Sequence, residues 1–266
     1  MNGELLIIGG HEEKYNGEGI LQKFIELAKK NKGSIGILPT ASEIPDEVSA
    51  DYINVFRKLN AEDIKVLNIK SRNEANAEDF LDTMSQLSAL FITGGDQSRL
   101  AEIVGKTKLY DAIFERWKNG MVIAGTSAGA SIMGKFMIAS AKTKENDKGL
   151  KIDIESGFGF LNTLIDQHFS QRARFGRLLG AIAENPNLIG IGIDENTAIL
   201  VENDKFKVYG EHQVFVIDGN EGSLVDLAIS ESGGEELTIS NFKLHTLTNG
   251  FSFDLNTRQL INRKED

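Results

Sequence analysis

The sequence predicts an α/β protein with a largely parallel central sheet, helices on both faces of that sheet, and antiparallel edge strands from the C-terminal part. Two patterns predict this fold. Short apolar runs alternate with segments of helical periodicity in the first half, whereas strand patterns joined by a tight turn dominate the second half. Such alternation builds βαβ units, whose parallel strands are buried between helices.

The elements of the first half follow from the spacing of apolar residues. Short apolar runs predict strands at residues 5–8, 34–38, 65–67, 90–93 and 121–124. Apolar residues at three- and four-residue spacing predict helices within 19–30, 46–59 and 77–87. Ligands bind beyond the carboxyl ends of the strands in open sheets of this kind. The candidate loops are therefore residues 9–11, 39–42, 94–97 and 125–129.

The second half reads mainly as antiparallel structure. Residues 198–202 and 205–209 flank Asn203-Asp204 as a hairpin, and residues 213–218 continue the alternation. Strands or hairpins are expected within 238–247 and 251–255. An apolar run at 158–165 is interpreted as a turn, and a helix is expected at 178–183.

Composition excludes several classes of protein. Hydrophobic residues make up 41% and charged residues 26% of the 266 residues, and no linker-like tract divides them, so one domain over 1–266 is expected. A net charge of −10 argues against sequence-independent nucleic-acid binding. No apolar run is long enough to cross a bilayer, and the N-terminus resembles a strand rather than a signal peptide. A cytoplasmic protein without membrane contact is expected.

The segment Gly125-Thr126-Ser127-Ala128-Gly129 has the pattern of a nucleophile elbow. It joins an expected strand to a helix-competent run, and a serine on such a sharp turn needs small neighbours. The backbone N–H of Ala128 at the helix start can stabilise an oxyanion. The alternative is an ordinary turn in a glycine-rich chain.

A serine nucleophile needs a base and an acid. His168 is the first candidate base among the four histidines because it lies in a polar segment, and a structural hydrogen-bonding role is the alternative. His11 is kept as a second choice. Asp194 and Glu195 both follow an apolar run at 188–193, and the sequence does not choose between them as the acid.

Cofactor and metal motifs are missing from the sequence. It contains no Gly-x-Gly-x-x-Gly, no Walker-type loop and no His-Glu-x-x-His, and it contains no cysteine. His11-Glu12-Glu13 could offer metal ligands, but three adjacent residues on one loop rarely form a closed site. We therefore expect no cofactor and no metal.

Four motifs between residue 5 and about residue 215 point to a family. They are Gly94-Gly95-Asp96-Gln97, Gly125-Thr126-Ser127-Ala128-Gly129-Ala130, Asp166-Gln167-His168-Phe169 with its arginines, and Asp194-Glu195-Asn196-Thr197-Ala198. In this order they resemble the cyanophycinases of peptidase family S51, which also holds aspartyl dipeptidases. The resemblance implies a fold similar to class I glutamine amidotransferases and a homodimer.

The resemblance also implies an activity and its residues. The activity is serine exopeptidase cleavage of cyanophycin, an aspartate polymer with arginine on each side-chain carboxyl, into β-Asp-Arg dipeptides. Ser127 would be the nucleophile, His168 the base and Glu195 the acid. The N–H of Gly95 would join that of Ala128 as an oxyanion donor, and Gln97 would contact substrate.

A group of charged residues around His168 suits such a substrate. Arg172, Arg174 and Arg177 are candidates to bind a free carboxylate, while Asp166 and Gln167 could accept from an arginine side chain. The alternative is a helix start with surface arginines. The family segment often reads Arg-Gly-Arg, whereas Ala173 stands between the arginines here, and alanine would strain a turn that needs a positive φ.

Two other functions remain open at this level. One is a dipeptidase for small aspartyl peptides, from which the polymer is excluded by pocket shape. The other is a non-catalytic protein that binds an aspartyl or amino-acid ligand; an intact set of Ser127, His168 and Glu195 weighs against it.

Overall fold

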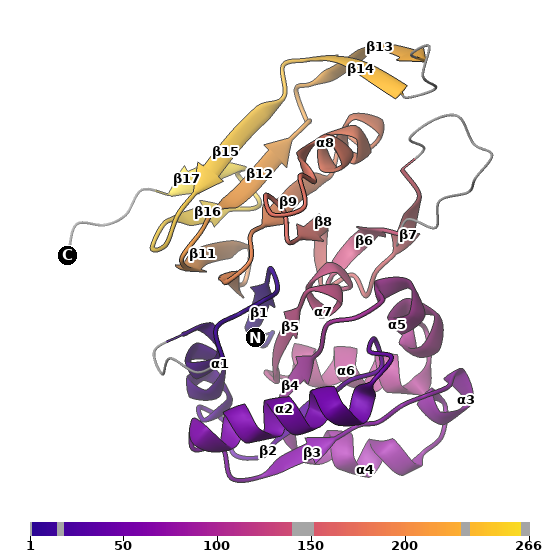
Figure 1. Ribbon diagram of the computed structural model, residues 1–266, viewed down its shortest axis with the longest axis vertical. Coiled ribbons are helices and arrows are strands. Elements are labelled where there is room, and N and C mark those ends of the chain that lie inside the picture. The colour runs from indigo at the N-terminus through magenta and orange to yellow at the C-terminus, as the bar shows by residue number, and fades with distance from the viewer. Residues whose placement is uncertain (1, 15–18, 140–151, 230–234, 262–266) are drawn as a thin grey trace.

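The computed structural model describes residues 2–14, 19–139, 152–229 and 235–261 (Figure 1). The larger of its sheets has nine strands: β1 (Leu5–Ile8), β2 (Ser34–Leu38), β3 (Ile64–Val66), β4 (Leu87–Ile92), β5 (Val122–Thr126), β10 (Thr197–Glu202), β11 (Lys205–Gly210), β16 (Ser252–Asp254) and β17 (Gln259–Ile261). Their order is β17-β16-β11-β10-β1-β5-β4-β2-β3.

Strands β1 to β5 run parallel to one another, and β10, β11, β16 and β17 extend the sheet beyond β1, each pairing antiparallel. The predicted α/β class, with its parallel core and antiparallel additions, is confirmed. The hairpin predicted around Asn203-Asp204 is the β10–β11 pair.

A second sheet, which the sequence analysis did not separate from the first, has six strands: β6 (Gly134–Ile138), β7 (Ile154–Ser156), β8 (Leu161–Gln167), β9 (Ile189–Ile193), β12 (Val214–Asp218) and β15 (Lys243–Leu247). Their order is β15-β12-β9-β8-β6-β7, and β6, β8 and β9 run parallel. The hairpin of β13 (Ser223–Ile229) and β14 (Glu235–Ser240) pairs separately.

One expectation is wrong: the run at 158–165, interpreted as a turn, enters strand β8 at Leu161. The strand expected at 213–218 is confirmed as β12, but it lies in the interior of the second sheet rather than at an edge of the first. Apolar alternation identifies a strand but not its partner, because pairing depends on residues far away in the chain.

Eight helices lie in the described residues: α1 (Ile20–Ala28), α2 (Pro45–Lys58), α3 (Arg72–Ala75), α4 (Asp79–Gln86), α5 (Gln97–Val104), α6 (Lys108–Lys118), α7 (Ala128–Ser131) and α8 (Phe175–Glu184). Helices α1 and α2 pack on one face of the nine-stranded sheet. Helices α4 to α7 and the inner face of the second sheet share the core on its other face, and α8 covers the outer face of the second sheet.

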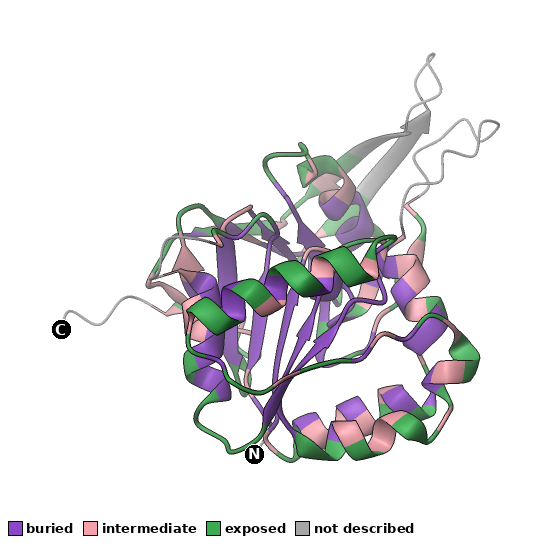
Figure 2. Cartoon of the chain, turned by 60° about the horizontal axis from the view of Figure 1, so that its bottom comes forward, coloured by how far each residue is buried: buried purple, intermediate pink, exposed green. Residues whose placement is uncertain are grey.

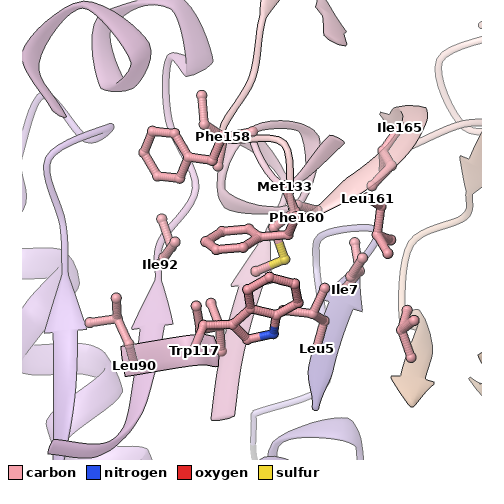
Figure 3. Close-up of a cluster of buried hydrophobic side chains, with 14 of the residues drawn as sticks. Leu5, Ile7, Leu90, Ile92, Trp117, Met133, Phe158, Phe160, Leu161 and Ile165 are labelled. Carbon is pink, nitrogen blue, oxygen red and sulfur yellow. The ribbon is translucent and has the colours of Figure 1, made fainter. Parts of the chain in front are cut away.

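Alternate residues of β1 face opposite cores, since Leu5 and Ile7 belong to one cluster and Leu6 and Ile8 to the other. Figure 2 shows the resulting pattern, in which the sheet strands are buried and the helices expose one side. Between the sheets, Trp117 of α6 packs edge-on against Phe160, and its indole N–H donates to the Gly3 carbonyl at 2.8 Å (Figure 3).

The packing of the two sheets against each other brings loops from both sheets together. The loop after β1, the loop after β4 and the turn after β5 come from the first sheet, and the loops after β8 and β9 come from the second. The site predicted beyond the carboxyl ends of strands is thus assembled from two sheets. None of the helices in the described ranges combines the length and hydropathy that a bilayer span requires.

Candidate active site

Ser127 lies at the turn from β5 into α7 with an unusual backbone conformation. Its φ is 53° and its ψ −111°, a region that non-glycine residues rarely adopt. Its N–H donates to the Ile8 carbonyl at 3.0 Å, and its own carbonyl accepts from Ala130 and Ser131 at 3.0 Å. The strand on one side and the helical turn on the other therefore hold the strained geometry of the elbow.

The two glycines of the elbow are required by close packing. A Cβ on Gly125 would collide with the carbonyl of Gly129, and a Cβ on Gly129 would collide with the carbonyl of Ile92. Small residues at both positions allow α7 to pack directly against β4 and β5. This is the physical reason for the Gly-x-Ser-x-Gly pattern in this chain.

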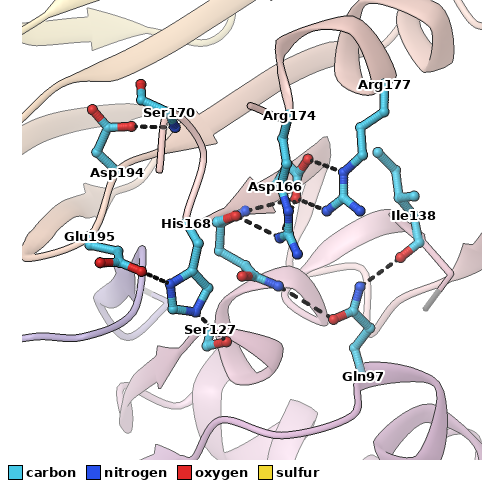
Figure 4. A network of polar contacts seen from close by, with 11 residues as sticks. Gln97, Ser127, Ile138, Asp166, His168, Ser170, Arg174, Arg177, Asp194 and Glu195 are labelled. Atoms are coloured by element: carbon cyan, nitrogen blue, oxygen red, sulfur yellow. Dashed lines mark hydrogen bonds and ion pairs between the residues drawn. The ribbon is translucent and has the colours of Figure 1, made fainter. Parts of the chain in front are cut away.

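His168 follows strand β8 and contacts Ser127. Its Nε2 lies 3.0 Å from Ser127 Oγ, and its Nδ1 lies 2.6 Å from Glu195 Oε1 (Figure 4). Since a carboxylate can only accept, Nδ1 carries the proton and Nε2 of the neutral ring accepts from the serine hydroxyl. The His168 N–H donates to the Gly9 carbonyl at 2.8 Å, which links the end of β8 to the end of β1.

The surroundings of His168 favour its neutral form. Burial is the largest influence and lowers the pKa of His168; the hydrogen bond that His168 donates to Glu195 raises it in part, and the nearby charge of Arg172 lowers it further. The net pKa lies below the usual value for histidine. Burial also raises the pKa of Glu195, but hydrogen bonds from His168 and His11 outweigh that effect and leave it lowered.

Local sequence reasoning left Asp194 and Glu195 equivalent as the acid, and the family resemblance implied Glu195; the structure gives the two side chains different partners. Asp194 is buried, and its oxygens accept from the backbone N–H groups of Ser170 at 2.8 Å and Gln213 at 3.3 Å. Glu195 instead reaches His168. Asp194 therefore ties loops together, while Glu195 orients the imidazole.

His11, the second-choice base, lies on the other side of Glu195. Its Nδ1 is 2.7 Å from the same Oε1 that His168 contacts, and the two rings meet edge to face at 5.0 Å. Its neighbour Glu12 turns inward, where it accepts from the hydroxyls of Tyr52 and Thr126, both at 2.6 Å. The group of described side chains that could hold a metal is thus His11, His168 and Glu195, not the sequential His11-Glu12-Glu13.

The loop after β4 lies beside Ser127. A Cβ on Gly94 would stand 3.7 Å from Ser127 Oγ, and Gly95, at φ +141°, packs so closely on Ala41 that a Cβ would collide with that carbonyl. Within the described residues, neither the Gly95 N–H nor the Ala128 N–H donates to another backbone group. Their assignment as oxyanion donors stays a prediction.

Two glutamines line the same region from α5 and β8. Both are buried, and Gln97 Nε2 donates to the Ile138 carbonyl at 2.6 Å while Gln97 Oε1 accepts from Gln167 Nε2 at 3.5 Å (Figure 4). Gln167 Oε1 has no hydrogen-bond partner in the part of the chain that the structure describes. A buried acceptor without a partner is costly unless a ligand satisfies it.

The three predicted arginines divide into two groups. Arg177 donates to the buried Asp166 carboxylate from Nε, at 2.7 Å, and from Nη2. Arg174 Nη1 donates to the same carboxylate at 3.2 Å and to the Gln167 carbonyl at 2.6 Å. Arg172 is exposed and forms no part of this network. The Asp166 carboxylate therefore holds two arginines of its own chain, and a direct contact with a substrate arginine would require these ion pairs to open.

The partly buried position of Arg174 affects its pKa. Burial lowers the pKa of Arg174 most strongly, Asp166 offsets part of that effect, and the charges of Arg177 and Arg172 lower it further, to about 10. The guanidinium remains protonated near neutral pH.

The comparisons with known proteins agree with the motif pattern. The family model described as "Peptidase family S51" matches residues 5–209. A cyanophycinase from Geminocystis herdmanii is 35% identical over 97% of this chain and 96% of its own length. A cyanophycinase from Trichormus variabilis is 36% identical over 97% of this chain and 87% of its own length.

A solved structure supports the fold. The crystal structure of a peptidase from an acI-B1 Actinobacterium superposes with a TM-score of 0.70 over 96% of this chain and 97% of that one, at 24% identity.

Ala173 provides a test of the strain around the site. Its φ is +51°, so alanine stands in the left-handed conformation that the sequence analysis raised as a possibility. Relief of that strain outweighs the greater freedom of glycine in the unfolded chain, so Ala173→Gly is expected to raise the free energy of unfolding by about 0.5–1 kcal/mol. Urea unfolding followed by circular dichroism measures the change.

The matched control is the same exchange in a regular helix. Ala50 is exposed within α2, where Ala50→Gly is expected to lower the free energy of unfolding by about 1 kcal/mol. Destabilisation of similar size by both changes would mean that the Ala173 backbone is not strained.

Proposed function

The chain belongs to peptidase family S51, and we propose that it is a serine exopeptidase that hydrolyses cyanophycin to β-Asp-Arg dipeptides. The observation that carries the proposal is the continuous set of contacts from Ser127 Oγ through His168 to Glu195, at 3.0 Å and 2.6 Å, on a strained elbow. Two cyanophycinases that are 35–36% identical over 97% of the chain support the substrate.

In the first half of the proposed reaction, Ser127 Oγ attacks the carbonyl carbon of the scissile amide while His168 Nε2 accepts the hydroxyl proton. The carbonyl oxygen becomes an oxyanion, which the N–H groups of Ala128 and Gly95 stabilise. Protonated His168, stabilised by Glu195, then gives its proton to the leaving amine. The amide bond breaks, and an acyl ester on Ser127 remains.

In the second half, water attacks the ester carbonyl and gives a proton to neutral His168. Collapse of the second tetrahedral intermediate breaks the ester bond, and the proton returns from His168 to Ser127 Oγ. The enzyme regains its starting protonation state, so the two halves add up to hydrolysis of one amide by one water molecule. No cofactor enters this proposal.

The polar side chains around the triad suit a substrate with both charges. Arg174 and Arg177 are held by Asp166 at the edge of the site and can face the free carboxylate of an aspartyl unit. The unpartnered Gln167 Oε1 can accept from an N–H group of the substrate. Binding of substrate would thus satisfy a buried acceptor. The homodimer and cytoplasmic location implied above remain predictions.

Removal of the nucleophile is the first test of this function. Ser127→Ala is expected to lower the release of β-Asp-Arg from cyanophycin by about 10⁴-fold or more, because no other group can form the acyl ester. Mass spectrometry of the soluble products measures the release. Ser131→Ala is the matched control, since Ser131 Oγ is buried in the adjoining helix α7 without a partner among the described residues, and that variant should keep its activity.

Retained activity in folded Ser127→Ala would contradict the serine mechanism. Product release from small aspartyl peptides but not from the polymer would assign the dipeptidase alternative instead, and ligand recovered unchanged would assign a binding protein.

The two acidic neighbours should differ in what they affect. Glu195→Gln is expected to lower kcat by about 10²–10⁴-fold, because the neutral amide no longer stabilises the imidazolium and can favour the wrong tautomer. Asp194→Asn should act on stability instead, with a loss of about 1–3 kcal/mol as one backbone N–H loses its acceptor. Steady-state kinetics and urea unfolding of both variants test the assignment; the opposite ranking in kcat would reassign the acid to Asp194.

The pH profile should reflect the lowered pKa of His168. Only the neutral ring accepts the serine proton, so kcat/KM should rise with pH through the pKa of His168, and its midpoint should lie below the ordinary histidine value of about 6.5. Arg172→Gln should move that midpoint upward, because the Arg172 charge contributes to the lowering. A midpoint above 6.5 in the unmodified protein would show that burial does not control the base.

A further inference from the structure

Two imidazole rings share one carboxylate oxygen at the solvent side of the triad. His11 Nδ1 and His168 Nδ1 lie 2.7 Å and 2.6 Å from Glu195 Oε1, and the three possible ligand atoms lie within 4.8 Å of one another. Histidine nitrogen and carboxylate oxygen are common ligands of zinc. The triad chemistry uses His168 and Glu195 but assigns no role to His11.

We propose that His11, His168 and Glu195 form an inhibitory binding site for a zinc-type divalent cation. The metal would take one ligand atom from each residue and a water molecule as the fourth, which is the common tetrahedral arrangement with one open position. The inference concerns regulation of the site proposed above and rests on that assignment of the triad.

Inhibition follows from the proton on His168. In the active form Nδ1 carries the proton and Nε2 is free to accept from Ser127. A metal bound to Nδ1 needs the lone pair of that nitrogen, so the ring proton moves through solvent to Nε2. Nε2–H then donates to Ser127 Oγ and can no longer act as a base. The ring stays neutral and no net proton is lost, so removal of the metal restores the active tautomer.

The positions of the side chains suit a reversible metal site. The His11 side chain is 70% exposed and provides access from solvent, whereas His168 is fixed beneath it. The metal would replace the two N–H···O contacts with bonds of about 2.0–2.2 Å, which requires a small movement of the exposed His11. Ca²⁺ and Mg²⁺ prefer a shell of oxygen atoms, and one carboxylate with two imidazoles does not offer it.

Direct metal binding can be measured without any substrate. Purified full-length protein competes with a chromophoric zinc indicator, and the Ser127→Ala variant is titrated in the same way. We expect one tightly bound Zn²⁺ per chain in both proteins. His11→Asn should weaken zinc binding by about 10-fold or more, since one of three protein ligands is lost.

Asparagine is the informative replacement at this position. It tolerates the positive φ of His11, +46°, and can still donate a hydrogen bond to Glu195, but it is a poor zinc ligand. Weakened binding in His11→Asn therefore reports a lost ligand rather than a collapsed loop. His212→Asn is the matched control, because His212 is also exposed but lies outside the cluster, and its zinc affinity should match that of the unmodified protein.

Activity provides the second readout. Zn²⁺ at buffered free concentrations should inhibit cyanophycin hydrolysis over the range in which it binds, a chelator should reverse the inhibition, and Mg²⁺ or Ca²⁺ should have no effect. Each variant is compared with its own metal-free rate, and His11→Asn should need about 10-fold more zinc for the same fractional inhibition.

The two proposals can fail separately. Equal zinc affinity in His11→Asn and the unmodified protein, or equal inhibition by Mg²⁺, would overturn the metal site and leave the hydrolase intact. Zinc binding that depends on His11 in a protein that does not release β-Asp-Arg would overturn the proposed function and leave the metal site.

Discussion

The whole site depends on the hydrogen bonds that join the two sheets where the carboxyl ends of their parallel strands meet. The His168 N–H donates to the Gly9 carbonyl at 2.8 Å, the Gly9 N–H donates to the Thr197 carbonyl at 2.9 Å, and the Asn196 N–H donates to the Gly10 carbonyl at 2.9 Å. These bonds connect the loops after β8 and β9 to the loop after β1. Ser127 comes from one sheet and its two partners from the other, so the join sets the distances within the triad.

The glycines in this join allow backbones and rings to approach closely. A Cβ on Gly9 would collide with the Asp194 carbonyl, and a Cβ on Gly10 would collide with the His168 ring. Around them, non-glycine residues with positive φ gather at the site: His11, Ser127, His168, Ala173 and Asn196. Such conformations cost about 1–3 kcal/mol each and persist only where the surrounding structure holds them. Strain at these five positions is thus tolerated where side chains of the site must be held in a fixed direction.

Three carboxylates near the site have different kinds of partner. Asp166 holds Arg174 and Arg177, Asp194 accepts from backbone N–H groups, and Glu195 accepts from two imidazoles. Buried carboxylates require such partners because an isolated buried charge is very unfavourable. Because Asp166 holds Arg174 and Arg177, cationic side chains lie at the candidate active site although the net charge of the chain is −10.

The sequence by itself determined the strands of the parallel core and the elbow, because both depend on local features, whereas the run at 158–165 was wrongly interpreted as a turn. The spacing of apolar residues identified the strands of the parallel core. The small residues around Ser127 indicated a turn at which a strand and a helix pack closely against each other. The family resemblance had favoured Glu195 over Asp194 as the acid, and the tertiary structure shows that Glu195 contacts His168. Only the tertiary structure decided that Arg174 and Arg177 contact Asp166 while Arg172 stands apart, and that His11 contacts Glu195. These choices depend on side-chain direction and on pairing between segments far apart in the chain, which local periodicity does not encode.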